Sequence, residues 1–328
     1  MDATGYGEFC AKGERVKKGM KKKEIDANLK MAGEFESTLK GKDFSKATKK
    51  DVERFARKLV KEGRNDWDAF VGLLRYARFV GNEDVEIATL ILIDGTSVLP
   101  ELAEEIGKRH GAVKKAAVLG GVKLPSVGTS TKQMPKAASK FVRNLRKELG
   151  DREARKVLHT GVHAGPKEQH AHHREMYLKA GSVDGYLAAR RKEFVSLLAK
   201  HASEGTLFYN QRIDDAVMEY VRKTPEMEGG QRKGRTIFVV KIPYMAIDYL
   251  SEKNPIMRRY YFCHCPWARE TILEGKELDP EFCHCSAGYT KKPLDVAFDA
   301  DLEIEVLESV LAGDDRCRFA VHLPKGLK

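Results

Sequence analysis

The sequence contains no long apolar run. Along its 328 residues, no stretch stays apolar for the roughly 18 residues that a membrane-spanning helix needs. The start of the chain, MDATGYGEFCAKGERVKKGMKKKE, also lacks the apolar segment of a secretory signal peptide. We therefore expect a cytoplasmic protein with no membrane partner.

Repeats and the common nucleic-acid-binding signatures are missing too. We find no internal repeat at the periods of solenoid proteins, and no helix-turn-helix or zinc-finger spacing. The composition is nevertheless that of a folded chain, because 42% of the residues are hydrophobic. The formal net charge of +11 suits nucleic acid, an anionic surface or an anionic substrate, although a solvated basic surface has the same composition.

The length allows two domains, each with its own core. Residues 1–30 are rich in lysine and have no periodicity, which predicts a basic flexible arm. Residues 31–118 carry helical periodicity and predict an all-helical domain. Residues 119–136 are rich in Gly, Pro, Ser and Thr, which is typical of a linker. Residues 137–328 then form an α+β, cysteine-rich domain.

The clearest helix of the N-terminal domain follows Thr48. Thr48 and Asp51 match a capping box, and apolar residues at helical spacing come next. Gly63 is placed to end the helix.

The C-terminal domain alternates between strand-like and helix-like segments. Strands are predicted at 235–242, 258–265 and 281–288, with short helices between them. A closing hairpin is predicted from 301–311 and 317–324. This order predicts an α+β domain with a mixed or antiparallel sheet and helices on one face.

The most distinctive feature is a doubled Phe-Cys-His-Cys, with Cys263 and Cys265 in the first copy and Cys283 and Cys285 in the second. Residues i and i+2 of a strand point to the same face, about 6–7 Å apart. Two neighbouring strands would therefore bring four sulfurs together, as zinc or an iron–sulfur cluster requires. The alternatives are small apolar core residues, or catalytic thiols that need no metal. Disulfides are not expected in a reducing compartment.

The predicted hairpin adds three candidates. Cys317 is in phase with Phe319, so its side chain should face the core. Glu308 falls among apolar residues, where a carboxylate can serve as a general base with a raised pKa, unless the strand bulges and exposes it. Asp314 occupies a turn, where it either bonds the backbone or takes part in chemistry.

Five histidines stand in LHTGVHAGPKEQHAHH. His159 and His163 have the i, i+4 spacing of a helical metal site, but Thr160 stands where a zincin has its Glu. These histidines are either exposed in a loop or fold back onto the cysteines as ligands or proton carriers.

The segments CPWARETILEGKELDPEFC and LESVLAGDDRCRF resemble the aminothiazoline-carboxylate hydrolase-like family, within residues 205–324. A related pattern occurs in vinyl-reductase-like small-molecule-binding domains. The resemblance implies an α+β ligand-binding fold, sometimes containing a metal, and a ring-opening hydrolase activity. One cysteine of each pair departs from the family pattern, because Cys263 and Cys285 are additional to it. The matching positions are Cys265, Pro266, Cys283, Gly313, Asp314, Cys317 and Phe319.

Three functions follow as hypotheses. The first is a small-molecule, hydrolase-like enzyme that acts on a carbon–nitrogen compound in a cysteine-lined pocket. In it, Cys265, Cys283 and Cys317 hold a metal or supply a nucleophile, helped by a base such as Glu308 or His264.

Arg232 and Arg235, in the loop GGQRKGR, would hold a substrate carboxylate in this enzyme. The second hypothesis is a non-catalytic sensor module that binds a metal, a cluster or another ligand. The third, nucleic-acid binding through the basic helical domain, is the least expected, because acidic residues alternate with the basic ones.

Overall fold

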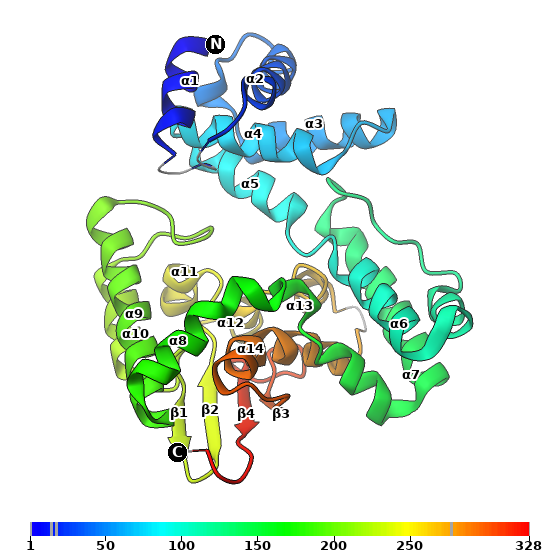
Figure 1. The fold of residues 1–328 in the computed structure, drawn as a ribbon. Coiled ribbons are helices and arrows are strands. Elements are labelled where there is room, and N and C mark those ends of the chain that lie inside the picture. Colours follow the sequence, from blue (N-terminus) through cyan, green and yellow to red (C-terminus); the bar gives the residue numbers. More distant parts are fainter. Residues whose placement is uncertain (1, 14–15, 17–18, 276–277, 328) are drawn as a thin grey trace. The chain divides into compact units, whose positions relative to one another are not determined.

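The computed structural model describes residues 2–13, 16, 19–275 and 278–327. The chain divides into two compact units, drawn from blue to red along the sequence in Figure 1. Unit 1 comprises residues 1–96 and 125–133, and unit 2 comprises residues 97–124 and 134–328. The expected linker at 119–136 is therefore not a simple boundary, because the chain passes into unit 2 after residue 96 and returns to unit 1 for residues 125–133.

Unit 1 is helical. Its α3 begins after Thr48, which forms the predicted capping box with Asp51, and ends at Gly63 in the left-handed conformation. Its helices are α1 (Ala3–Lys12), α2 (Lys22–Ser37), η1 (Phe44–Lys46), α3 (Lys49–Glu62), α4 (Trp67–Val80), α5 (Glu83–Ile93) and η2 (Thr131–Gln133).

The prediction of a basic flexible arm at residues 1–30 was wrong for the described residues of that segment. Tyr6 and Cys10 of α1 are buried in the core of unit 1. Tyr6 packs against Tyr76 and Phe79, with ring centroids 5.3 and 5.5 Å apart. These aromatic contacts hold α1 against α4. They were not evident from the lysine-rich composition of the segment.

None of the described helices in either unit is long and apolar enough to cross a membrane.

Unit 2 contains a four-stranded sheet and the remaining described helices. The elements of unit 2 are α6 (Val98–Leu119), α7 (Met134–Leu158), η3 (Val162–Ala164), η4 (Lys167–His170), α8 (Ala171–Ala180), α9 (Val183–Glu204), α10 (Asp215–Lys223), β1 (Gln231–Lys233), β2 (Thr236–Val240), α11 (Ala246–Ser251), α12 (Pro255–Phe262), α13 (Arg269–Glu274), η5 (Pro280–Phe282), α14 (Cys283–Phe298), β3 (Glu303–Glu308) and β4 (Arg318–His322).

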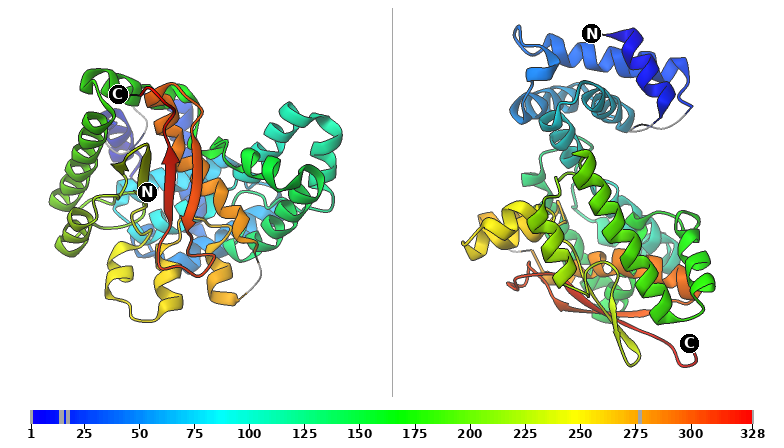
Figure 2. Two further views of the ribbon diagram at one scale, coloured as in Figure 1. Left: turned by 90° about the horizontal axis from the view of Figure 1, so that it is seen from below. Right: turned by 90° about the vertical axis from the view of Figure 1, so that its left-hand side faces the viewer.

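The sheet has the order β1-β2-β4-β3, and every neighbouring pair is antiparallel. Ile237, Val239, Phe319 and Val321 alternate along β2 and β4 and bury one face of the sheet against α8, α9 and α14. Figure 2 shows these helices on one side of the strands. The predicted α+β class, with a helical N-terminal part and helices on one face of the sheet, is confirmed.

Two predicted strands are helices, and this changes the geometry of the cysteines. Residues 258–265 fall largely in α12, which starts with Pro255 and is capped by the Asn254 side chain. Residues 281–288 fall in η5 and α14. In a helix, residues i and i+2 point about 200° apart. Cys283 and Cys285 therefore cannot present their sulfurs on one face.

Two glycines allow the segment after α7 to lie directly on α14. A Cβ on Gly288 would stand 2.7 Å from the backbone carbon of His159, and one on Gly161 would stand 2.5 Å from the carbonyl oxygen of Gly288. Such distances are too short for any side chain. This close approach places His159 and His163 against α14.

Candidate functional site

Four thiols gather at one end of the sheet, and we call them the thiol cluster. They are Cys263 and Cys265 in the loop after α12, Cys283 at the start of α14, and Cys317 just before β4. The four thiols are close enough for the charge on one to act on the pKa of another. Burial, and then the neighbouring thiol of Cys317, raises the pKa of Cys283 well above its usual value; Cys263 and Cys265 act in the same direction.

The β3–β4 connection positions the Cys283 thiol. The Ser309 hydroxyl donates a hydrogen bond to Cys283 Sγ at 3.0 Å. Asp314 in turn accepts a hydrogen bond from the Ser309 backbone N–H at 2.8 Å, while its own N–H donates to the Ser309 carbonyl at 3.1 Å. Asp314 thus serves the backbone of its turn and positions Ser309. Its charge also adds to the rise in the pKa of Cys317.

Three thiols of the cluster, those of Cys263, Cys283 and Cys317, have raised pKa values and are protonated at neutral pH. Burial raises the pKa of Cys263 to about 12, and the neighbouring Cys265 adds to this shift. Burial also raises the pKa of Cys317 to about 12, with a further contribution from Cys263. A thiol of this kind is a proton donor at rest, and it becomes a nucleophile only when something accepts its proton.

Cys285 belongs to a separate group on α14. His163 Nδ1 lies 3.6 Å from Cys285 Sγ, and the His163 ring stacks on Tyr289 with centroids 5.0 Å apart. Burial raises the pKa of Cys285 to about 12 and lowers the pKa of His163 to about 3. We predicted that His159 or His163 folds back toward the cysteines. His163 does so and contacts Cys285. His159 instead contacts His284, with 2.7 Å between His159 Nε2 and His284 Nδ1.

Two buried cations lie beside the thiols. Lys241 is 8% exposed and Arg269 is 4% exposed. Lys241 Nζ lies 4.8 Å from the ring centroid of Tyr289, and the Arg269 guanidinium lies 4.5 Å from that of Tyr244. Within the described part of the chain, neither cation forms an ion pair with a carboxylate. Cation–π contacts compensate only part of the cost of burying a charge.

The two cations act on the same thiol. The charges of Lys241 and Arg269 both oppose the rise in the pKa of Cys263, and Lys241 does the same at Cys317. Lys241 continues β2, and its N–H donates to the Cys317 carbonyl at 3.3 Å. Lys241 and Cys317 are thus cross-strand neighbours on the helix-covered face of the sheet, in phase with Val239 and Phe319.

His264 is held as a neutral imidazole with a defined tautomer. Its Nε2 contacts the carbonyl oxygen of Ile242 at 2.5 Å. A carbonyl oxygen only accepts, so Nε2 carries the proton and Nδ1 keeps its lone pair. Burial lowers the pKa of His264 to about 3, and the charge of Lys241 acts in the same direction.

Three predicted site residues lie outside this arrangement. Glu308 accepts two hydrogen bonds from Arg316, at 2.8 and 2.9 Å, and Arg316 holds the pKa of Glu308 below its usual range. The register of β3 shifts between Val306 and Glu308, which confirms the predicted bulge, although Glu308 is half-buried and not exposed. The paired carboxylate does not fit the predicted base with a raised pKa.

Arg232 and Arg235 belong to the β1–β2 hairpin, at the opposite end of β2 from Lys241. Six residues of extended chain separate Arg235 from Lys241, which is about 20 Å. Arg232 is also bound by Asp184, at 2.9 and 2.7 Å. These arginines therefore do not hold a ligand beside the thiols.

The residues present do not fit the predicted metal centre. Cys285 is turned away from Cys263, Cys265 and Cys283, as the helical geometry requires. Among the described side chains, no three from Cys, His, Asp or Glu converge closely enough to hold a metal ion. The predicted ligand set for zinc or an iron–sulfur cluster is therefore not assembled.

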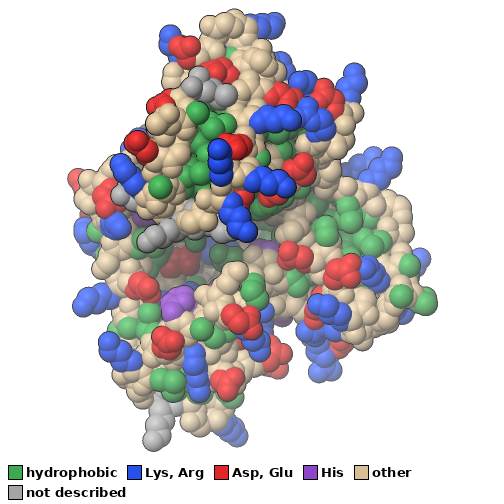
Figure 3. Space-filling view, turned by 45° about the horizontal axis from the view of Figure 1, so that its top comes forward, with side chains coloured by type: hydrophobic (Ala, Val, Ile, Leu, Met, Phe, Trp, Pro, Cys, Tyr) green, Lys and Arg blue, Asp and Glu red, His purple; other side chains and the backbone are tan. Residues whose placement is uncertain are grey.

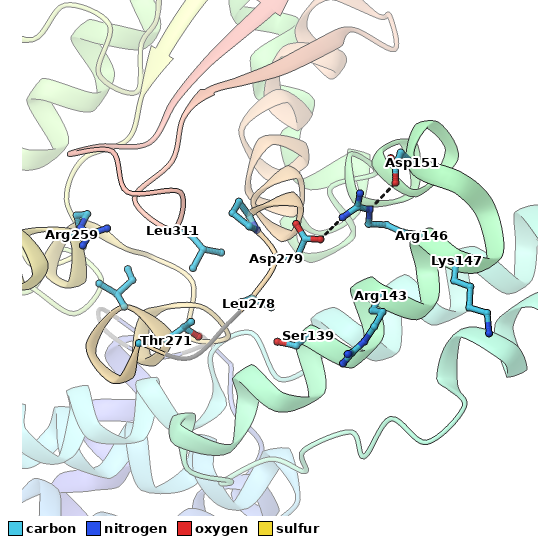
Figure 4. Close-up of a pocket in the computed structure, with 13 residues that line it drawn as sticks. Ser139, Arg143, Arg146, Lys147, Asp151, Arg259, Thr271, Leu278, Asp279 and Leu311 are labelled. Carbon is cyan, nitrogen blue, oxygen red and sulfur yellow. Dashed lines mark hydrogen bonds and ion pairs between the residues drawn. The ribbon is translucent and has the colours of Figure 1, made fainter.

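A large open pocket of about 1000 Å³ lies in unit 2 (Figure 4). Its lining contains no cysteine, so it is not the cysteine-lined pocket that we expected. Its walls do connect closely to the cluster, because Leu311 follows Ser309 by two residues and Pro280 precedes Cys283 by three. The lining residues are Ser139, Arg143, Arg146, Lys147, Asp151, Arg259, Thr271, Ile272, Gly275, Leu278, Asp279, Pro280 and Leu311.

The sequence reasoning missed Lys241, Arg269 and Ser309. One signal was available, because Lys241 stands in the apolar run TIFVVKI and is in phase with Ile237 and Val239. A lysine at an inward-facing position of a strand is a functional candidate. Arg269 and Ser309 carried no such pattern.

The comparison with known proteins concerns the C-terminal part of the chain, where the site lies. Residues 241–326 match a family of unknown function, DUF6144. The matched segment begins at Lys241 and contains the entire thiol cluster, with Arg269 and Ser309. No curated protein and no solved structure matches the chain. The resemblance to the aminothiazoline-carboxylate hydrolase-like family is not tested by this match and stays a prediction.

Proposed function

We propose that unit 2 is a hydrolase-like enzyme for a small, anionic carbon–nitrogen compound, with Cys283 as its nucleophile. The observation that supports this most is the pair of buried cations, Lys241 and Arg269, which have no carboxylate partner among the described residues and both act on Cys263 of the thiol cluster. A substrate carboxylate would supply the missing negative charge.

Cys283 is the best-placed nucleophile of the cluster. It is half-buried, as Cys265 and Cys317 also are, whereas Cys263 is buried. It begins the 16-residue helix α14, whose N-terminus favours negative charge on the sulfur as it develops. The Ser309 hydroxyl is already directed at the same sulfur.

Because the Cys283 thiol is protonated, its substrate must carry a basic atom that can accept the thiol proton. The C=N nitrogen of a cyclic amidine, in its neutral form, can accept the thiol proton while the sulfur adds to the carbon. The tetrahedral adduct then transfers a proton to the ring nitrogen, the C–N bond breaks, and the amine leaves a thioimidate on Cys283. Water adds to the thioimidate, the C–S bond breaks with return of a proton to sulfur, and the products are an amide and a free thiol.

A cytoplasmic location fits this proposal. All six cysteines are free thiols in the described structure, and a reducing compartment would preserve them. The chemistry needs the thiol form of Cys283.

Binding of nucleic acid through unit 1 is less well supported. Arg54 pairs with Asp51, and Lys58 and Arg64 both pair with Glu34. Figure 3 shows Lys and Arg side chains interspersed with Asp and Glu on the face that it presents. A surface of mixed charge does not follow a phosphate backbone well.

The proposal is tested by incubating the full chain with cyclic amidines and thiazolines that carry a carboxylate, beside their neutral methyl esters. Ring opening is followed as a gain of one water by mass spectrometry. We expect turnover of the carboxylates, its loss in Cys283→Ser, and a KM raised about tenfold or more in Lys241→Met, which corresponds to the loss of one charged hydrogen bond. Lys192→Met, an exposed position on α9, is the control with unchanged kinetics. Tight binding without turnover would instead support the sensor module.

A further inference from the structure

We propose that the pocket of Figure 4 is a second binding site, for an organic phosphate of nucleotide size. This inference does not depend on the proposed hydrolase function. The pocket has a volume of about 1000 Å³, which is at the upper end of the range for small-molecule sites.

The first argument is the charge of the pocket. Arg146 is bound by both Asp151 and Asp279, as the dashed lines in Figure 4 show, so these three residues together carry a net charge of −1. The structure gives no ion pair to the other three cations of the lining, Arg143, Lys147 and Arg259, among the residues that it describes. With the excess carboxylate counted, the lining carries a net charge of +2. This matches a ligand with more than one negative charge, which a phosphate group supplies and a single carboxylate does not.

The second argument is a buried hydroxyl without a partner. Thr271 lines the pocket and is 4% exposed. Its Oγ1 is buried and has no hydrogen-bond partner among the residues that the structure describes. An unpaired buried hydroxyl is costly and is rare in native proteins. A ligand oxygen in the pocket would satisfy it.

The third argument is the mixed character of the walls. Ile272, Leu278 and Leu311 provide an apolar surface between the cations of α7 and Arg259 of α12. Figure 4 shows Leu311 and Leu278 lying between Arg259 and Arg143. Such a surface suits the flat apolar body of a nucleoside, while the cations hold its phosphates.

The test is calorimetric titration of the full chain with ADP, pyrophosphate and adenosine. We expect ADP to bind more tightly than either part alone, and Arg143→Gln and Arg259→Gln each to weaken it about tenfold. The control is Lys136→Gln, an exposed lysine on the same helix that does not line the pocket. Equal effects of the control and pocket variants, or no binding at millimolar ADP, would overturn the proposal. Pyrophosphate binding as tightly as ADP would overturn the nucleotide-sized ligand.

Thr271→Val separates a ligand contact from a structural role. The change keeps the shape of the side chain and removes the unpaired hydroxyl, so we expect the melting temperature of the free protein to rise. If the hydroxyl also meets the ligand, ADP affinity falls several-fold in the same variant. A higher melting temperature with unchanged ADP affinity would contradict the assignment of Thr271 to the site.

Discussion

The Ser309 hydroxyl donates a hydrogen bond to the Cys283 thiol at 3.0 Å. The two residues are 26 positions apart, and the β3–β4 connection brings them together through the Ser309–Asp314 backbone contacts. The Gly-Asp-x-x-Cys segment therefore has a physical role in the site, since it orders the loop that carries the donor to Cys283.

The first prediction concerns this donor. Ser309→Ala should lower kcat about ten- to a hundredfold, because a hydrogen bond to a developing thiolate contributes about 1.5–3 kcal/mol. Ser309→Thr keeps the hydroxyl and should retain most of the rate. Steady-state kinetics on a carboxylate-bearing cyclic amidine measures both. Equal rates in the alanine variant and the native protein would show that the contact is only structural.

The second prediction concerns the protonation of the cluster. Since burial raises the pKa of Cys283 well above its usual value, iodoacetamide should label it at pH 7 about a hundredfold or more slowly than it labels a cysteine of the unfolded chain. The rate should rise steadily with pH up to at least pH 9. Peptide mapping by mass spectrometry locates the label. Rapid labelling of Cys283 below pH 7 would identify a low-pKa thiolate and a different mechanism.

The third prediction is acid sensitivity of unit 2. Burial lowers the pKa of His163 and His264 to about 3, below the usual histidine value of about 6.5. The folded state then binds fewer protons than the unfolded state between these values. The stabilisation is complete above pH 6.5 and is lost as the pH falls toward 3, by up to about 1.4 kcal/mol per pH unit for each histidine.

His163→Phe isolates one of these contributions. The phenyl ring can keep the stacking on Tyr289 and cannot titrate. The free energy of unfolding of the variant should depend less on pH between 6.5 and 4, by about one proton. Identical pH dependence in chemical denaturation of the two proteins would show that His163 is not held neutral.

The fourth prediction concerns the contact between Gly288 and the segment after α7. Gly288→Ala should destabilise the protein by about 1–3 kcal/mol, because its Cβ would meet backbone atoms of His159 and Gly161 at 2.7–2.8 Å. Gly7→Ala, in α1, is the control, since no atom lies within 4 Å of its Cβ, and it should be neutral or slightly stabilising. Chemical denaturation measures both variants. A Gly288→Ala protein as stable as Gly7→Ala would contradict the close approach.

The sequence predicted those elements whose signals are local. The capping box at Thr48 and the closing hairpin were readable because each needs only residues that are close in the chain. The segment around Cys263 was misread because its apolar and aromatic residues suit a strand, whereas the Asn254 cap starts a helix there.

The candidate site was only partly predictable for a related reason. Cys283 and Cys317 were identified from the sequence, but their meeting depends on how α14 lies against the sheet. Only the tertiary structure shows that the buried Lys241 has no carboxylate partner among the described residues. The same holds for the buried Thr271 hydroxyl, which has no hydrogen-bond partner among them. Spacing along the chain gives residue types, while the tertiary structure decides which of them share a site.

The most direct test of the central claim is a search for the covalent intermediate. The full chain is mixed with a carboxylate-bearing cyclic amidine, quenched in acid within the first turnover, and digested for mass spectrometry. The account predicts a thioimidate on the peptide that contains Cys283, absent from Cys283→Ser and reduced in Lys241→Met. Turnover of the same compound by Cys283→Ser at the native rate, with no adduct on the native chain, would contradict it.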